Sequence, residues 1–111
     1  MAWIVYVHPR AEDEIVDLPA KEERSMRLAM AKLEAMGRAL PFPHSSNIQG
    51  ADDELRELRP RRGASPWRGF YRDYDAFSVV AAVGPEAARD SRGFDGAVDI
   101  ALKRLAEVVD E

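Results

Sequence analysis

Residues 55–84 read LRELRPRRGASPWRGFYRDYDAFSVVAAVG, and this stretch decides the fold. LRELR is a short strand candidate, and RPRRGASP is a turn that contains a glycine and two prolines. WRGFYRDY is a second strand candidate. FSVVAAVG is a continuous apolar run, as expected of a central strand covered on both faces. With a tight turn at Asp75–Ala76, the stretch predicts a three-stranded antiparallel meander.

The chain before the meander predicts one strand and two helices. Residues 3–8, WIVYVH, are rich in β-branched and aromatic side chains and end at Pro9. Apolar residues then recur at helical spacing on both sides of Pro19, which breaks the pattern into a helical hairpin. Gly37 is the expected C-terminal cap of the second helix. Residues 40–50 contain two prolines and two serines without periodicity and predict a loop.

The chain after the meander predicts one amphipathic helix. Apolar residues from Phe94 to Val109 keep i, i+3, i+4, i+7 spacing, the strongest periodic signal in the sequence. The predicted order is therefore β-α-α-β-β-β-α in a single α+β domain over residues 1–111. A chain of 111 residues and 12.4 kDa has the length of one domain.

Composition excludes several kinds of site. The sequence has no cysteine, which excludes disulfides, thiolate nucleophiles and Cys-ligated zinc. His8 and His44 lie too far apart for a metal-ligand motif, so we expect no metal and no cofactor. No apolar run approaches the roughly 18 residues of a membrane span and no signal-peptide pattern is present. We therefore expect no membrane association and a cytoplasmic location.

The net charge of −4 hides a basic segment. Six arginines and one glutamate give residues 56–72 a charge of +5, so the rest of the chain carries −9. Arginine binds phosphate through a planar, permanently charged fork, and the interleaved aromatic residues can stack on bases. This pattern favours a nucleic-acid surface. The alternative is that these arginines pair with acidic side chains at the surface.

Two short motifs in this order resemble the RelE/ParE toxin superfamily, and most closely its HigB-like branch with phage-derived relatives. They are ELR at residues 57–59 and WRGFYR at residues 67–72. The resemblance also includes the segment from Leu33 to Gly37, and Ala101 with Arg104 in the last helix. It implies a RelE-like fold, a small twisted antiparallel sheet with the helical hairpin and the C-terminal helix packed on it.

The resemblance also implies a function. The chain would be the toxin of a type II toxin–antitoxin system, a metal-free endoribonuclease that cleaves mRNA, either free or on the ribosome, and inhibits translation and growth. Its partners would be mRNA and a cognate antitoxin, expected to be a helix-turn-helix protein. The alternative function is a non-catalytic toxin fold that binds a host protein such as DNA gyrase. A third option is a small accessory domain whose arginines are paired at the surface.

Metal-free RNA cleavage uses the 2′-OH as nucleophile and needs a proton acceptor, a proton donor and cations around the phosphate. The resemblance assigns phosphate binding to Arg59, Arg68 and Arg72, and proton transfer or base stacking to Tyr71. Strand alternation places Tyr71 on the face opposite Arg68 and Arg72 unless a bulge at Gly69 or the strand twist re-aims one of them. Core packing for Tyr71 and a salt bridge between Arg59 and a helix carboxylate remain alternatives. RNA binding is expected at Arg56, Arg61, Arg62 and Trp67. Arg61 and Arg62 in the turn would steer the substrate, with inert surface charges as the alternative.

The chain departs from its HigB-like relatives after the last strand. Many members carry a phenylalanine and a Lys-Lys pair there, where this chain reads Val-Gly-Pro-Glu at residues 83–86. Its only lysines are Lys21, Lys32 and Lys103, all outside the basic segment, so a lysine acid or base is not expected. His8 and His44 are expected as surface residues, with acid–base work from the loop as the alternative for His44.

Overall fold

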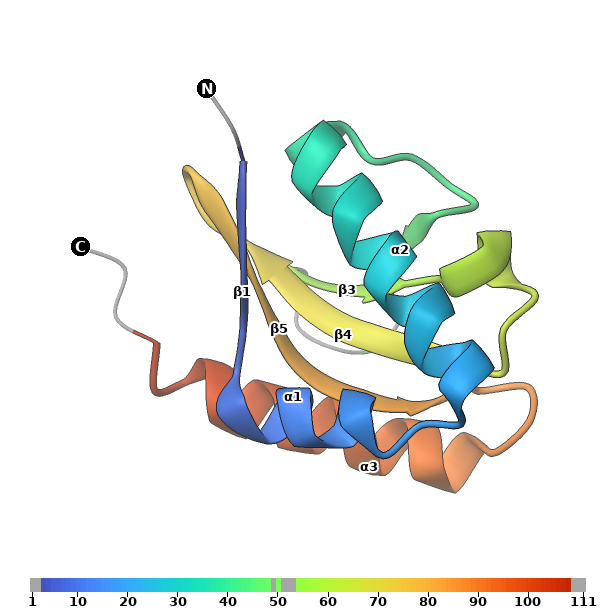
Figure 1. The fold of residues 1–111 in the computed structure, drawn as a ribbon. Helices are drawn as coiled ribbons and strands as arrows, with labels where there is room; N and C mark the ends of the chain where they lie inside the picture. Colours follow the sequence, from blue (N-terminus) through green and yellow to red (C-terminus); the bar gives the residue numbers. More distant parts are fainter. Residues whose placement is uncertain (1–2, 49, 51–53, 109–111) are drawn as a thin grey trace.

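The computed structural model describes residues 3–48, 50 and 54–108 (Figure 1). The elements, in chain order, are β1 (Ile4–Val7), α1 (Pro9–Val16), α2 (Ala20–Met36), the 3-10 helix η1 (Gly37–Ala39), β2 (Ser45–Asn47), β3 (Leu55–Leu58), the 3-10 segment η2 (Pro60–Gly63), β4 (Trp67–Asp73), β5 (Phe77–Pro85) and α3 (Ser91–Leu105). The five strands form one sheet in the order β1-β5-β4-β3-β2.

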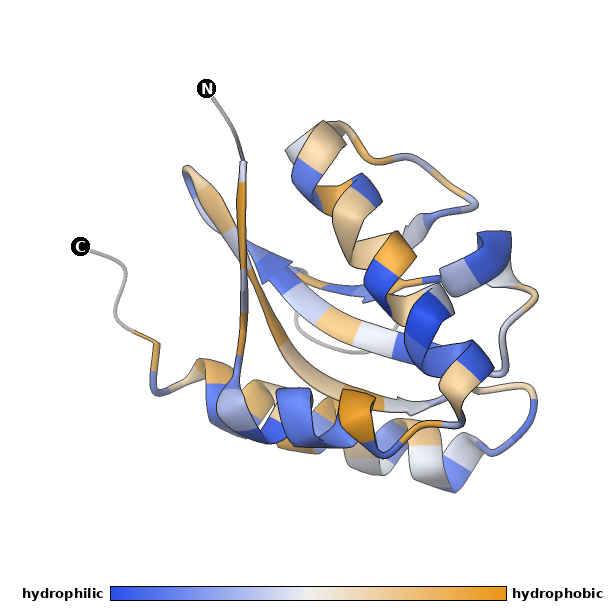
Figure 2. Ribbon diagram, viewed as in Figure 1, coloured by the Kyte–Doolittle hydropathy of each residue, from blue (hydrophilic) through white to orange (hydrophobic). Residues whose placement is uncertain are grey.

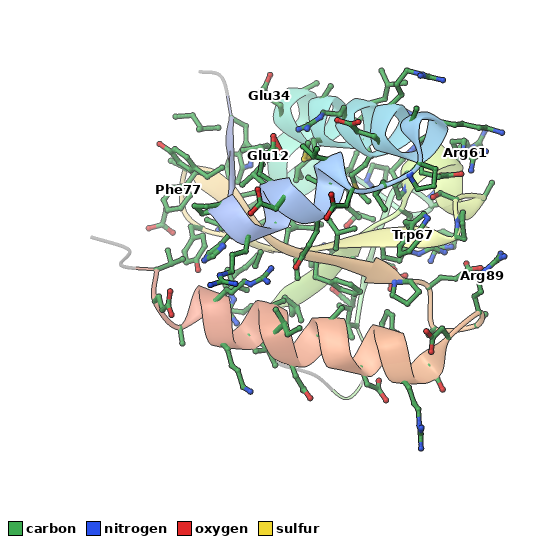
Figure 3. All side chains as sticks on the ribbon, turned by 60° about the horizontal axis from the view of Figure 1, so that its bottom comes forward. Glu12, Glu34, Arg61, Trp67, Phe77 and Arg89 are labelled. Carbon is green, nitrogen blue, oxygen red and sulfur yellow. The ribbon has the colours of Figure 1, made fainter. Side chains whose placement is uncertain are left out.

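The helices cover opposite faces of this sheet. Figure 3 shows α1 and α2 on one face and α3 on the other. The apolar residues divide in the same way, because one buried cluster joins α3 to β4 and β5 and a second joins α1 and α2 to the other face. The middle of β5 is hydrophobic, as a strand covered on both faces must be, whereas η2 is hydrophilic (Figure 2).

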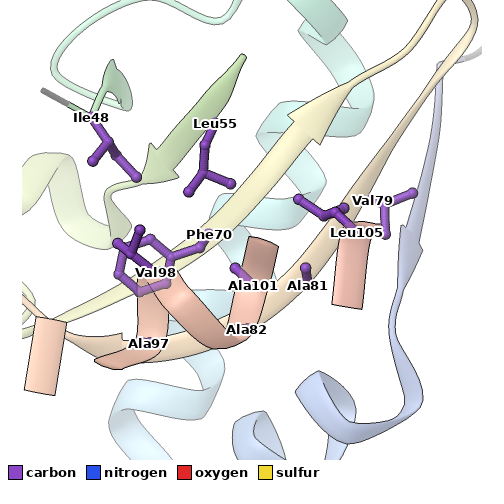
Figure 4. Packing of buried hydrophobic residues seen from close by; sticks show 10 residues of the cluster. All are labelled: Ile48, Leu55, Phe70, Val79, Ala81, Ala82, Ala97, Val98, Ala101 and Leu105. Carbon is purple, nitrogen blue, oxygen red and sulfur yellow. The ribbon is translucent and has the colours of Figure 1, made fainter. Parts of the chain in front are cut away.

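The α3 face is packed closely through small side chains. Four of the ten residues in its cluster are alanines, from β5 and α3 (Figure 4). Gly84 permits the same approach, since a Cβ atom built there would lie 2.5 Å from the Cβ atom of Ala97. A register shift between Phe70 and Tyr71 adds one residue to β5, so that Ala81 and Ala82 both join the α3-side cluster.

A side-chain ion pair completes the edge of β5. β1 pairs with β5 only as far as Val80. On that side of β5, the backbone groups after Val80 have no strand partner, whereas β4 pairs with β5 on the other side. Glu14 of α1 accepts the Val83 N–H at 3.0 Å, and Arg104 of α3 donates to the Ala81 carbonyl at 2.8 Å. The two side chains also bind each other at 2.8 Å. We call Glu14 and Arg104 the edge clamp. These contacts give a structural role to Arg104, which the family resemblance includes in the last helix.

The structure confirms the α+β class, the helical hairpin and the antiparallel meander β3-β4-β5. Gly37 caps α2 with φ +57°, and its N–H donates to the Leu33 carbonyl, as predicted. The break at Pro19 is also confirmed, with Pro19 as the N-cap of α2.

Three details of the predicted sheet and last helix are wrong. The sheet is mixed, because β1 lies parallel to β5 at its edge. The predicted loop contains β2, a three-residue polar edge strand whose sequence shows no alternation. The last helix begins earlier, with Asp90 as N-cap, and ends at Leu105, so Val108 lies beyond it. Val109 lies outside the described residues.

Candidate functional site

A groove of about 350 Å³ runs between α2 and the end of β3. Its α2 side carries Lys32 among apolar side chains, and its other side is formed by His44, Leu58, Arg59 and Arg61. Three cations and an imidazole therefore border one concave surface with an apolar floor. This is the site that we consider below and call the groove.

The local sequence explains why this side of α2 leaves space. Ser25 and Ala29 lie one helical turn apart and are small and buried, while Leu28 on the rim is 67% exposed. Lys32 follows on the next turn and is exposed. A helix with larger residues at these positions would fill the groove.

Arg59 is the residue that links the groove to the sheet. It follows β3 directly, and its guanidinium donates to the Glu57 carboxylate at 2.8 Å and to the Pro43 carbonyl at 3.0 Å. The same group lies 5.1 Å from the ring centroid of Phe42, which is 68% exposed. The predicted salt bridge of Arg59 is present, but its partner is on β3 instead of a helix. The stacked Phe42 adds an exposed aromatic ring beside a fixed cation.

Arg61 and Arg62 lie in η2 and differ in their partners. Arg61 donates both of its bonds to Glu22 of α2, at 2.7 and 3.0 Å, and borders the groove. Figure 3 shows Arg61 beside the N-terminal end of α2. Arg62 is exposed and makes no ion pair within the described part of the chain. The alternative that the arginines of the basic segment pair with acidic side chains at the surface therefore holds for Arg61 but not for Arg62.

Arg68 lies inside the protein and does not line the groove. Its side chain is only 4% exposed, and its guanidinium lies 2.9 Å from the Glu86 carboxylate and 3.6 Å from that of Glu57. Burial is the main cause of a lowered Arg68 pKa, partly offset by the two carboxylates. Its other donors meet backbone carbonyls of the turn before β4. The sequence predicted a phosphate ligand here, whereas the side chain is occupied by the protein itself.

Tyr71 lies on the face opposite Arg68 and Arg72, as the strand alternation predicted, and packs in the core beneath α2. Its hydroxyl is 2.5 Å from Ser45 Oγ and accepts a longer bond from Arg56, which also binds Asn47. Burial raises the pKa of this phenol, and the bonds from Ser45 and Arg56 oppose the shift. A phenol that is 1% exposed and held protonated is poorly placed to accept a proton.

The remaining predicted site residues are separated from one another. Arg72 lies on the α3 side of β4, 3.7 Å from a carboxylate oxygen of Glu54. Trp67 is half-buried against the core beneath α2. Among the described residues that line the groove are Arg59 and Arg61 but not Arg68, Tyr71, Arg72, Arg56 or Trp67.

Two residues of the groove were not among the predicted site residues. Lys32 was set aside because it lies outside the basic segment, and acid–base work was only an alternative for His44. The packing of α2 on the sheet places Lys32 on the groove, and the hydrogen bond from the Arg59 N–H to the His44 carbonyl, at 2.9 Å, places His44 beside Arg59. Their spacing in the sequence gives no signal of this contact. The predicted loop position of His44 was the one available hint.

Among the residues that the structure describes, no three or more His, Asp or Glu side chains form a group that could hold a metal ion. No helix in the described ranges is long and apolar enough to cross a membrane.

Comparisons with known proteins agree with this architecture. Residues 13–81 match the family described as "Phage derived protein Gp49-like (DUF891)". No curated protein sequence matches the chain. A solved structure of a mutant of the E. coli toxin RelE in the free state is similar, with a TM-score of 0.66 and 18% sequence identity. The alignment covers 95% of this chain and 99% of that one, so the similarity extends over the whole fold.

Proposed function

The chain belongs to the Gp49-like family of phage-derived proteins, a family of RelE-like toxins, and we propose that it is the toxin of a toxin–antitoxin system that cleaves RNA in the groove. The observation that carries the proposal is the convergence of Lys32, His44, Arg59 and Arg61 on one concave surface. The cognate antitoxin, mRNA as substrate, and membership of the HigB-like branch are parts of the same proposal.

The groove supplies the groups that RNA cleavage through the 2′-OH requires. Arg59 and Arg61 hold the scissile phosphate and stabilise the charge that develops on its oxygens. Lys32, on the opposite wall, adds a third cation. An imidazole can accept and donate protons near neutral pH, so His44 serves as the base for the 2′-OH or the acid for the leaving 5′ oxygen.

The carboxylates beside these arginines restrain them. Glu57 and Glu22 hold Arg59 and Arg61 in defined orientations before substrate arrives. Because their charges offset those of the arginines, the groove carries a modest net positive charge. We therefore expect weak non-specific affinity for RNA and a modest dependence of that affinity on salt. Phe42, exposed beside Arg59, is placed to stack on a base next to the cleaved bond.

The test is induced expression in bacteria together with mapping of RNA ends. Wild-type protein should arrest growth and cleave RNA, whereas Arg59→Ala and His44→Gln should each lower cleavage by roughly 100-fold, the usual scale for removing a charge stabiliser or a general acid–base. Arg92→Ala, an exposed arginine on α3, is the matched control and should keep full activity. Unchanged cleavage in both groove variants would refute the site.

A further inference from the structure

The turn between β3 and β4 has an unusual backbone. Arg61, Arg62 and Gly63 have φ values of +53°, +59° and +93°, so three successive residues are in the left-handed region. Glycine adopts this region readily, but arginine does so at a cost of about 1 kcal/mol or more for each residue. Such a conformation persists only when the surrounding structure fixes it.

Arg68 fixes this turn from inside the protein. One guanidinium nitrogen donates to the carbonyls of Ser65 and Trp67 at 2.7 and 3.0 Å, and another donates to that of Gly63 at 3.3 Å. The forked shape of the guanidinium is what allows one side chain to bind three carbonyls, and a lysine ammonium at this depth could not reproduce it. Glu57 and Glu86 balance its charge.

Other contacts hold the same turn from the groove side. The buried Ser65 hydroxyl donates to Glu22 at 2.8 Å and accepts the Trp67 N–H at 3.1 Å. A Cβ atom at Gly63 would lie 2.5 Å from a guanidinium nitrogen of Arg59, so the turn is packed directly against a groove residue. None of these contacts involves the Arg62 side chain, which is exposed.

We propose that Arg68 is a positioning residue, whose buried guanidinium holds the left-handed turn in shape and so aims Arg62 at a phosphate of the RNA strand that leaves the groove. This inference rests on the proposed function, because it takes RNA as the ligand. It assigns Arg68 no contact with substrate. Arg62 supplies the contact, one or more nucleotides away from the phosphate held by Arg59 and Arg61.

The test is a double-mutant cycle on RNA binding, with a short single-stranded RNA whose 2′-O-methyl sugars permit binding but prevent cleavage. Asparagine tolerates the left-handed region, so Arg62→Asn removes the charge and keeps the backbone. We expect it to weaken binding about fivefold and to lower the slope of log K against log salt by about 0.7, the value for one phosphate contact on a single strand. Arg92→Asn is the control and should leave the slope unchanged.

Arg68→Lys keeps the charge but cannot bind the three carbonyls. It should reproduce the loss seen in Arg62→Asn and add no further loss in the double variant. Hydrogen exchange should rise at the Ala64 and Ser65 amides, which the turn protects, while the amides of β5 stay protected. If Arg68→Lys does not fold, Glu86→Gln, which loosens the same guanidinium, replaces it in the cycle with the same expectation.

The outcomes separate the two proposals. Additive losses for Arg62 and Arg68, or a further fall in salt slope on changing Arg68, would show direct phosphate contact by Arg68 and overturn the inference alone. RNA binding that is unchanged in Arg62→Asn would also overturn the inference and leave the proposed function standing. Failure of the wild-type protein to bind RNA would overturn the proposed function, and this inference with it.

Discussion

The edge clamp and the groove both pair an arginine with a glutamate from a neighbouring helix, but they use the arginine differently. In the edge clamp, Arg104 binds Glu14 and a backbone carbonyl of β5, and the side chain is 14% exposed. In the groove, Arg61 binds only Glu22 among the residues that the structure describes; its side chain is 34% exposed and borders open space. The comparison teaches that an arginine largely buried between a carboxylate and a backbone carbonyl supports the fold, whereas a more exposed arginine that borders open space is available to a ligand.

The largest effect on stability is expected at the edge clamp. Arg104→Met should lower the free energy of unfolding by about 2–4 kcal/mol, because it leaves the Ala81 carbonyl without its donor and Glu14 without its partner in a partly buried position. Urea denaturation measures this loss. A change comparable with that of an exposed ion pair would show that the two regions do not differ.

A second test concerns the close packing of the α3 face. Gly84→Ala should cost about 1–3 kcal/mol, since its Cβ atom would lie 2.5 Å from that of Ala97. Gly96→Ala is the matched control, because no atom lies within 4 Å of a Cβ built there. As this glycine lies inside α3, the control should stabilise the protein by about 0.5–1 kcal/mol. Equal effects of the two substitutions in thermal unfolding would contradict the packing described here.

The groove should respond in activity more than in stability. Arg61→Gln removes a partly exposed ion pair, so we expect a loss of no more than about 1 kcal/mol in unfolding free energy. RNA cleavage should nevertheless fall by at least about tenfold, because one of the phosphate ligands is gone. Both quantities are measured on the same preparation. A large loss of stability with normal cleavage by the remaining folded protein would reverse the comparison.

The smallest effect is expected from pH at Tyr71. Burial raises the pKa of this phenol in the folded protein, so the unfolded chain loses its proton first as the pH rises. The contribution of Tyr71 to stability is therefore complete below pH about 10, the ordinary value for tyrosine, and declines above it. Denaturation curves between neutral and alkaline pH test this, with Tyr71→Phe as the variant that should lack that part of the decline. A wild-type curve that matches the variant would exclude the effect.

The sequence predicted the elements whose signals are local. The apolar run of β5, the helix cap at Gly37 and the opposite faces of Tyr71 and Arg68 all follow from spacing and turn residues, and the structure has them. The parallel pairing of β1 and the polar strand β2 depend on which segments meet in space. No local pattern encodes those contacts.

The candidate site was only partly predictable for the same reason. The basic segment was identified, but burial divides its arginines among the core, the turn and the groove. Arg68 has the residue type and motif of a phosphate ligand, and only the folded backbone around it reveals that three carbonyls occupy it. Lys32 lies across the groove from Arg59 and His44 lies beside Arg59, and both come from other parts of the chain.

The most direct test of the proposed activity is the chemistry of the RNA ends made by the purified protein. Attack by the 2′-OH predicts products with a 2′,3′-cyclic phosphate and a 5′-hydroxyl, and no cleavage at a position whose sugar lacks the 2′-OH. The yield of these products should fall by roughly 100-fold with the Arg59→Ala variant. Cleavage of the deoxy-substituted position, or ends bearing a 5′-phosphate, would contradict the account of the groove as a site for cleavage through the 2′-OH.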